Sequence, residues 1–226
     1  LSDTENEARV AAGLVSPNIV GPGSKPLNSE NFLHFAPQLV ELIRVKPQYA
    51  AVTVTLDKTG EFLQVAQSPS GGVVVRTTQA IAGGKTVLKK FTPFGNRLEP
   101  AGQVSETAAD QRTSNAYSIT KESKLVSWTT ADVLQTLPSG PQLGTICSAP
   151  ITDAEGRFFG VVSISITLTD LSRFLQTVKV SQHGFATLIE VLPDRTKVIA
   201  DPQPQRLMTT EGGNPRLVTI DEIPDD

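Results

Sequence analysis

The chain has 226 residues, of which 38% are hydrophobic and 19% charged, and its formal net charge is −3. This profile is typical of a globular protein with one large domain or two modest ones. It excludes a strongly basic surface with interleaved aromatic residues, so no nucleic-acid partner is expected. The single cysteine, Cys147, excludes an intrachain disulfide, and no apolar run reaches the roughly 20 residues of a membrane-spanning helix.

The first 48 residues are predicted to form a helical region. Residues 2–5 resemble a capping box, and the run that follows favours a helix. A second helix should carry an apolar stripe from Phe32 to Ile43, because apolar residues recur there at helical spacing. Pro37 lies inside that stripe and should kink or restart the helix.

From Tyr49 the hydrophobic period changes to two, which predicts strands. The first two strands should form a hairpin with its turn at 57–60. Two more strands are expected over 71–80 and 84–91. Residues 92–115 are rich in Pro, Gly, Asn, Asp and Ser, and this composition predicts a long surface excursion.

A strand-forming run at 124–134 is followed by a hairpin over 144–168. A helix capped by Thr169 or Asp170 should then lead to another hairpin at 184–201, before a polar and turn-rich end. Hairpins dominate, and strands do not alternate with crossover helices. The sequence therefore predicts an α+β fold with a mainly antiparallel sheet flanked by helices.

Residue types suited to catalysis are sparse. Cys147 lies in a predicted strand, the histidines are His34 and His183, and neither a G-x-S-x-G nor an H-E-x-x-H motif is present. Distant residues can meet in a fold, so a small periplasmic hydrolase that uses Cys147 or a serine stays open as an alternative. Two separated histidines and one cysteine predict no metal site, and no cofactor is expected.

The second strand of the 144–168 hairpin has two unlike faces. One face is apolar, and the other carries small hydroxyl groups at Ser163, Ser165 and Thr167. Hydroxyls on such a strand can face solvent, which alternation alone favours because half-exposed antiparallel strands are common. They can also line a pocket for a small polar ligand.

Three segments resemble the double Cache family, the extracytoplasmic PAS-like sensor modules of bacterial transmembrane receptors. They are DQRTSNAY at 110–117, VSWTTADV at 126–133, and the run at 144–175. The resemblance implies a long N-terminal helix within 1–48, a membrane-distal ligand-sensing domain at 49–178, and a smaller, incomplete membrane-proximal unit at 179–226. It also implies that the hydroxyl face of the strand lines the ligand cavity.

The resemblance further implies a set of ligand-contacting positions. They are Arg112, Ser114, Tyr117, Trp128, Asp132, Ser163 and Ser165. Where amino-acid-binding members have a second Arg and an Asp, this chain has Ser114 and Ser165. An α-amino acid needs an anion clamp for its carboxylate and an acid for its ammonium group. We therefore expect no amino-acid binding in the family's usual manner.

Three possibilities stay open for the pocket: a neutral polar ligand, a small carboxylate held by Arg112, or no ligand. Arg112 could instead form a structural ion pair with Asp110, and Trp128 could pack in the core rather than in the pocket wall.

The implied function is that of a non-catalytic sensor, which passes a conformational signal across the membrane to a cytoplasmic output domain. The segment at 47–63 resembles sensor regions of adenylate or guanylate cyclases, which favours a cyclase over a histidine kinase or a chemoreceptor. The chain begins at Leu1 without a methionine. We therefore expect a periplasmic part of a longer inner-membrane protein, anchored through flanking segments, with a homodimer left open. A sensor that binds a partner protein is the remaining alternative.

Overall fold

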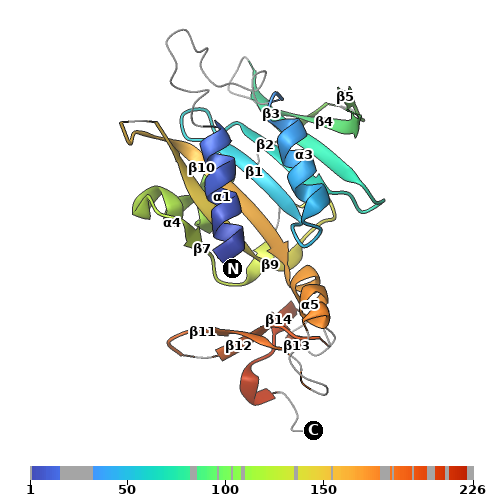
Figure 1. Ribbon diagram of the computed structural model, residues 1–226, viewed down its shortest axis with the longest axis vertical. Coiled ribbons are helices and arrows are strands. Elements are labelled where there is room, and N and C mark those ends of the chain that lie inside the picture. The colour runs from blue at the N-terminus through green and yellow to red at the C-terminus, as the bar shows by residue number, and fades with distance from the viewer. Residues whose placement is uncertain are drawn as a thin grey trace.

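The computed structural model has a large upper unit, which contains the main sheet, and a small lower unit (Figure 1). It describes residues 2–15, 33–81, 86–95, 97–102, 104–107, 110–134, 137–153, 155–178, 184, 186–194, 196–202, 207–211 and 214–222. His183 and residues 82–84, around which the strands predicted at 71–80 and 84–91 should turn, lie outside these residues. The α+β class predicted from the sequence is confirmed.

The described strands of the upper unit form one antiparallel, ten-stranded sheet. The order along the sheet is β5-β4-β3-β2-β1-β10-β9-β7, with β6 paired to β4 and β8 paired to β9. The strands are β1 (Ala51–Leu56), β2 (Phe62–Gln67), β3 (Val73–Ala80), β4 (Thr86–Phe94), β5 (Arg97–Pro100), β6 (Ser105–Thr107), β7 (Ser127–Trp128), β8 (Asp132–Leu134), β9 (Gln142–Thr152) and β10 (Phe158–Thr167). The predicted hairpins β1–β2, β3–β4 and β9–β10 are confirmed.

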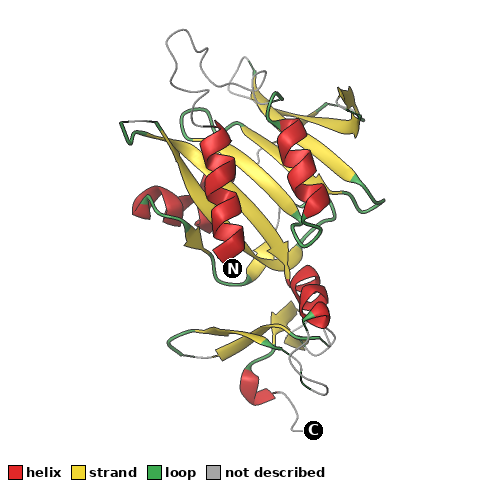
Figure 2. Ribbon diagram, in the orientation of Figure 1, coloured by secondary structure: helices red, strands yellow, loops and turns green. Residues whose placement is uncertain are grey.

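Helices α1 (Ser2–Val15) and α3 (Ala36–Val45) lie against the same face of the sheet (Figure 2). Their alanine-rich and leucine-rich stripes pack on the apolar sides of β1, β9 and β10 in one core cluster. The predicted start of the second helix, before residue 33, lies outside the described residues, and Pro37 stands at the beginning of the described helix α3. The helix begins at Ala36, so the proline occupies the first turn, where its missing N–H removes no helical hydrogen bond.

The opposite face of the sheet carries the 3₁₀ turn η2 (Gln111–Thr113) and helix α4 (Asn115–Ser123). The two faces of β10 divide as predicted, because Val162, Ile164 and Ile166 join the core under α1 and α3. Ser163 and Ser165 therefore point to the side of η2 and α4. This division places the hydroxyl groups on the face where a cavity lies.

The predicted surface excursion at 92–115 is corrected by the structure. The segment contains the end of β4, the short strands β5 and β6, and η2, and the helix α4 that follows was not predicted. In the β4–β5 hairpin at the end of the sheet, Pro93 lies opposite Leu98, and Pro100 lies opposite Phe91. An edge strand tolerates proline because its outward N–H groups have no ladder partner to lose.

The lower unit begins with α5 (Leu168–Thr177), whose N-cap is Thr167 and not Thr169 or Asp170 as predicted. It continues with the predicted hairpin β11 (Leu188–Val191) and β12 (Thr196–Ala200). A second hairpin, β13 (Met208–Glu211) and β14 (Asn214–Leu217), occupies the end that was expected to be only turn-rich, followed by η4 (Ile220–Glu222).

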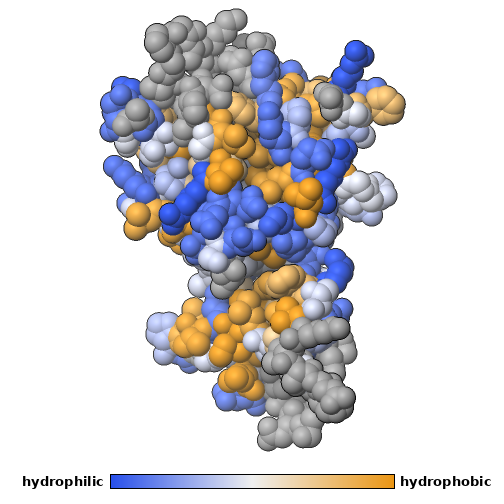
Figure 3. Space-filling model, in the orientation of Figure 1, coloured by the Kyte–Doolittle hydropathy of each residue, from blue (hydrophilic) through white to orange (hydrophobic). Residues whose placement is uncertain are grey.

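Apolar side chains gather on the visible face of the lower unit (Figure 3). The exposed apolar residues in the described part of this unit include Ile189, Val191 and Ile220. Neither lower sheet has more than two strands among the described residues, and such ribbons are only marginally stable alone. None of the described helices combines the length and the apolar character needed to cross a membrane.

Candidate ligand-binding cavity

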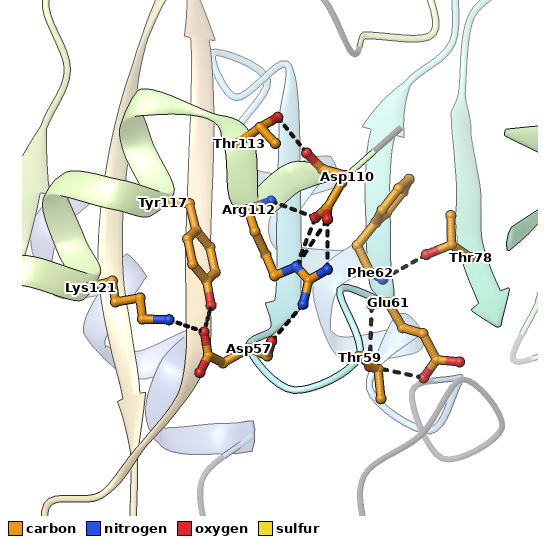
Figure 4. A network of polar contacts seen from close by, with 10 residues as sticks. All are labelled: Asp57, Thr59, Glu61, Phe62, Thr78, Asp110, Arg112, Thr113, Tyr117 and Lys121. Carbon is orange, nitrogen blue, oxygen red and sulfur yellow. Dashed lines mark hydrogen bonds and ion pairs between the residues drawn. The ribbon is translucent and has the colours of Figure 1, made fainter. Parts of the chain in front are cut away.

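A network of ion pairs ties the η2–α4 segment to the β1–β2 turn (Figure 4). The guanidinium of Arg112 pairs with Asp110, at 2.7 Å from Nη2 to Oδ2, and its Nη1 donates to the Asp57 carbonyl oxygen at 2.9 Å. The Asp57 carboxylate accepts from the Tyr117 hydroxyl at 2.5 Å and from Lys121 Nζ at 2.6 Å. We call these five residues the clamp.

The clamp shifts the ionisation of its own members. Hydrogen bonds from Arg112 hold the pKa of Asp110 below its ordinary value, against the effect of burial. Burial alone would raise the pKa of Asp57, but the hydrogen bonds from Lys121 and Tyr117 outweigh it, so this pKa is also lowered. Burial, and then the bond to Asp57, raises the pKa of Tyr117. Both carboxyl groups are thus held as carboxylates, and Tyr117 is held as a donor.

Gly60 allows the β1–β2 turn to approach the Arg112 side chain closely. Its φ is +71°, and a Cβ atom there would lie 2.9 Å from the guanidinium carbon of Arg112. A larger residue would therefore meet both backbone strain and the arginine.

A cavity of about 480 Å³ lies on the hydroxyl-bearing side of the sheet. Its floor comes from β9 and β10, one wall from η2 and the start of α4, and the other wall from the segment at 129–134. The lining residues are Asp110, Gln111, Thr113, Ser114, Asn115, Ala116, Thr129, Thr130, Asp132, Val133, Leu134, Gly144, Ile146 and Ser165. A volume of this size suits a small molecule.

The lining is polar and lacks cationic groups. Five hydroxyl and two amide side chains face carboxylates of Asp110 and Asp132, and no lysine, arginine or histidine belongs to the lining formed by the described residues. Asp110 is already paired with Arg112. The arrangement offers donors and acceptors to a neutral ligand and a negative charge to an amine. It offers no cationic group that could bind a carboxylate.

Local hydrogen bonds fix the first wall. Ser114 caps α4, because its Oγ accepts from the Tyr117 N–H at 3.3 Å and donates to the Gln111 carbonyl at 2.8 Å.

In the floor, a Cβ atom at Gly144 would lie 2.3 Å from a methyl group of Leu134 and 2.5 Å from the Ile166 carbonyl oxygen. Glycine is therefore required where β8 closes on β9.

The sequence-derived site residues separate into two groups. Ser114, Asp132 and Ser165 line the cavity, and Ser165 is buried at 7% exposure. Arg112 and Tyr117 belong to the clamp behind the first wall and are absent from the lining.

Ser163 lies two residues from Ser165 on the same face of β10, but outside the lining. It hydrogen-bonds Ser148 on β9 at 2.9 Å between the hydroxyl oxygens. This pair continues in a polar row across the sheet, in which Gln64 donates to Thr53 at 3.1 Å and accepts from Arg76. The hydroxyl group of Ser163 is thus bonded to the neighbouring strand and does not line the cavity.

Trp128 lies on the other side of the sheet. It packs against the core under α1, and its Nε1 donates to Glu5 Oε1 at 3.0 Å. Cys147 lies in the same core with no exposed surface, and burial, followed by the charge of Glu5, raises the pKa of its thiol to about 12. A thiol with these properties is poorly suited to act as a nucleophile.

A scan against protein-family models gives no match, and a search of curated proteins gives none either.

Solved structures do resemble the chain. The ligand-binding domain of the Campylobacter jejuni chemoreceptor Tlp3, in complex with 4-methylisoleucine, has a TM-score of 0.55 and 16% identity over 90% of this chain and 63% of that one. The extracellular domain of a candidate histidine kinase, mmHK1S-Z3, has a TM-score of 0.51 and 13% identity, again over 90% of this chain and 64% of that one. A methyl-accepting chemotaxis protein X has a TM-score of 0.53 and 13% identity.

The chain shares its fold with the ligand-binding domain of Tlp3 and the extracellular domain of mmHK1S-Z3. The fold that the double Cache resemblance implies is therefore confirmed. The chain spans less than two thirds of the length of the first two structures, and identities this low bear on the fold alone.

Sequence reasoning did not name most of the cavity lining. It missed the polar residues of the first wall, because α4 was not predicted and its N-terminal residues could not be placed at a helix start. The signal was present in Ser114, which is a preferred N-cap residue. It also missed Asp57, which lies in a turn 60 residues before Tyr117 and meets it only in the fold.

Proposed function

We propose that this chain is the ligand-sensing part of an extracytoplasmic receptor, and that the cavity between η2–α4 and the 129–134 segment binds a small polar molecule. The supporting observation is a cavity of about 480 Å³ whose floor contains Ser165 and whose walls carry hydroxyl and amide groups. The solved neighbours are described as ligand-binding, sensory or extracellular domains, which is consistent with this role. The proposal includes no catalytic step, because Cys147 is buried on the opposite face.

The charges of the cavity favour a neutral or amine-bearing ligand. Arg112 is engaged by Asp110 and by the Asp57 carbonyl, which argues against a small carboxylate held by Arg112. Asp132 is an exposed carboxylate on the cavity wall. The same charges argue against α-amino acids bound through a carboxylate clamp, although Tlp3 is described in complex with amino acids such as L-valine.

The cellular context belongs to the proposal as well. We propose that the chain faces the periplasm, is held at the inner membrane through flanking segments, forms a homodimer and signals to a cytoplasmic output domain. The domain limits 49–178 and 179–226 are part of the proposal too, although the lower unit as described begins earlier, with α5 at Leu168. The solved neighbours come from chemoreceptors and a histidine kinase, so a cyclase output is supported by the 47–63 segment alone.

A thermal-shift screen with three groups of probes tests the binding proposal. The probes are neutral sugars such as ribose, amines such as ethanolamine, and monocarboxylates such as acetate and lactate. A ligand at a hundredfold excess over its Kd adds about 2.7 kcal/mol to the stability of the native state. For a protein of this size this corresponds to a rise in Tm of roughly 5–11 °C. We expect such rises from sugars or amines and none from monocarboxylates.

Two variants locate the response. Ser165→Trp fills the cavity from its floor and should abolish the rise, whereas Ser118→Trp, on the exposed side of α4, should preserve it. A rise that survives Ser165→Trp would place the binding site elsewhere and contradict the proposal. A rise caused only by monocarboxylates would overturn the assignment of ligand class.

A further inference from the structure

One segment serves both as a wall of the cavity and as a contact of the lower unit. Thr129, Thr130 and Asp132–Leu134 line the cavity, and we call residues 129–134 the wall. Ala131, in the middle of the wall, is absent from the cavity lining and is 6% exposed. It belongs to an apolar cluster with Leu168 at the start of α5, Ile199 and Leu217. A displacement of the wall therefore changes the packing of the lower unit.

The wall is anchored to the sheet on its cavity side. The Thr129 N–H donates to the Ile146 carbonyl at 2.9 Å, and the Ile146 N–H donates to Thr129 Oγ1 at 3.0 Å. Thr145 Oγ1 donates to the Thr129 carbonyl at 2.8 Å. After Ala131, strand β8 pairs again with β9. Ala131 thus lies between two fixed points, where the backbone leaves the sheet.

Glu190 of β11, in the lower unit, contacts the wall at Ala131. Its Oε1 accepts a hydrogen bond from the Ala131 N–H at 3.1 Å. Its Oε2 is buried and has no hydrogen-bond partner among the residues that the structure describes. A carboxylate oxygen left unpaired away from water costs free energy, whereas an apolar side chain at this seam would not. The contact therefore fixes the position of the wall at a cost in stability.

We propose that Glu190 is a positioning residue that couples the cavity to the lower unit through the Ala131 N–H. This inference rests on the proposed function, because it identifies how occupancy of the cavity reaches the rest of the receptor. A ligand that shifts the wall changes the Glu190 contact and the packing of Ile199 and Leu217. By linkage, a change in the lower unit alters ligand affinity by the same factor.

Amide hydrogen exchange on the whole chain tests the coupling without a ligand. Thr129→Val removes the hydroxyl acceptor of the Ile146 N–H and loosens the wall on its cavity side, and the Ile146 amide verifies the loosening. The reporters are the amides of Val198 and Val218, which donate to the Val218 and Leu207 carbonyls in the lower unit. We expect Thr129→Val to speed their exchange about threefold or more, as a loss of local stability would.

The same comparison is then made in variants of Glu190. In a Glu190→Ala background, Thr129→Val should affect the two reporters clearly less, because only the apolar contact of Ala131 with Ile199 and Leu217 then connects the wall to the lower unit. Glu190→Gln keeps an oxygen for the Ala131 N–H, so the threefold effect should return. Val191→Ala, on the exposed neighbour in β11, is the control and should leave the effect intact. A purely structural role of Glu190 would change the exchange rates but not this dependence.

The proposal is overturned if Thr129→Val leaves the reporters unchanged, or if its effect is the same in the unmodified chain and in the Glu190→Ala background. A failed coupling test together with a positive thermal-shift screen contradicts the coupling alone. A successful coupling test with a ligand response that survives Ser165→Trp contradicts the proposed binding site alone.

Discussion

Single residues carry much of the geometry of the clamp, and Gly60 is the clearest case. Gly71 has the same kind of backbone, at φ +88°, but a Cβ atom there meets nothing within 4 Å. Gly71→Ala should cost about 1–2 kcal/mol from the left-handed backbone alone. Gly60→Ala should cost about 1 kcal/mol more, because the Arg112 guanidinium must give up a hydrogen bond.

Chemical denaturation of the two alanine variants measures this difference. In an Arg112→Ala background the clash is gone, so the two glycine substitutions should have equal cost. A difference that persists without Arg112 would show that the arginine does not restrict position 60.

Two fully buried threonines make a matched pair for the cost of an unpaired hydroxyl. Thr78 Oγ1 accepts from the Phe62 N–H at 2.8 Å, whereas Thr120 Oγ1 is buried and finds no hydrogen-bond partner in the described part of the chain. Thr78→Val leaves a buried N–H unpaired and should cost about 1–3 kcal/mol. Thr120→Val removes an unpaired group and should raise the free energy of unfolding by about 1 kcal/mol. Urea titration of both variants checks the signs, and destabilisation by Thr120→Val would indicate a partner for its hydroxyl.

At the scale of elements, the clamp that holds η2 and α4 on the β1–β2 turn contains the carboxylates of Asp57 and Asp110, and both have lowered pKa values. The folded state therefore binds these protons less tightly than the unfolded state does. The stabilisation is complete above the ordinary Asp pKa of about 3.9 and is lost as the pH falls through the lowered values.

Stability should accordingly decline below about pH 4. Asp110→Asn removes one of the two groups, so it should lower stability at neutral pH and flatten the decline in acid. Urea midpoints between pH 2 and pH 6 measure both effects. Parallel acid declines in the two proteins would show that the Asp110–Arg112 pair contributes nothing to the pH dependence.

The elements that could be predicted from the sequence are those with a strong hydrophobic period. Alternation predicts hairpins β1–β2 and β9–β10, and proline geometry predicts a helix start near Pro37. Both are local properties of the sequence. Helix α4 could not be found in this way. Its nine residues are mostly polar, and its attachment comes from Tyr117 and Lys121, which bind an aspartate about 60 residues away.

The site residues also divide into those that could be predicted from the sequence and those that could not. The alternation of β10 and the family resemblance led to Ser165, and the resemblance led to Ser114 and Asp132, all three in the lining. Which arginine or tyrosine faces a ligand depends instead on the rotation of α4 and on the partners offered by the β1–β2 turn. Arg112 pairs with Asp110, which is the local alternative that the sequence offered, whereas Tyr117 bonds Asp57 of the β1–β2 turn, a distant partner that no local pattern encodes.

At the scale of the whole molecule, the upper and lower units share a core. The described strands of the lower unit form two-stranded ribbons, and its buried Leu168, Ile199 and Leu217 pack on Ala131 at the lower end of the upper unit. A two-stranded ribbon is marginal in water, so the lower unit should gain most of its stability from this contact. The chain should therefore unfold in one transition.

Two probes of one denaturant titration test this cooperativity. Trp128 is the single tryptophan, and it packs in the upper core, so its fluorescence follows the upper unit. Far-ultraviolet circular dichroism follows both units, and coincident curves are the signature of a two-state transition.

Leu168→Ala truncates the shared cluster and should cost about 2–5 kcal/mol. Because the lower unit depends on that cluster, the variant should also separate the two curves, with circular dichroism changing first. Separate curves in the unmodified chain would show instead that the lower unit folds independently, and the shared core would then have no role in joining the two units.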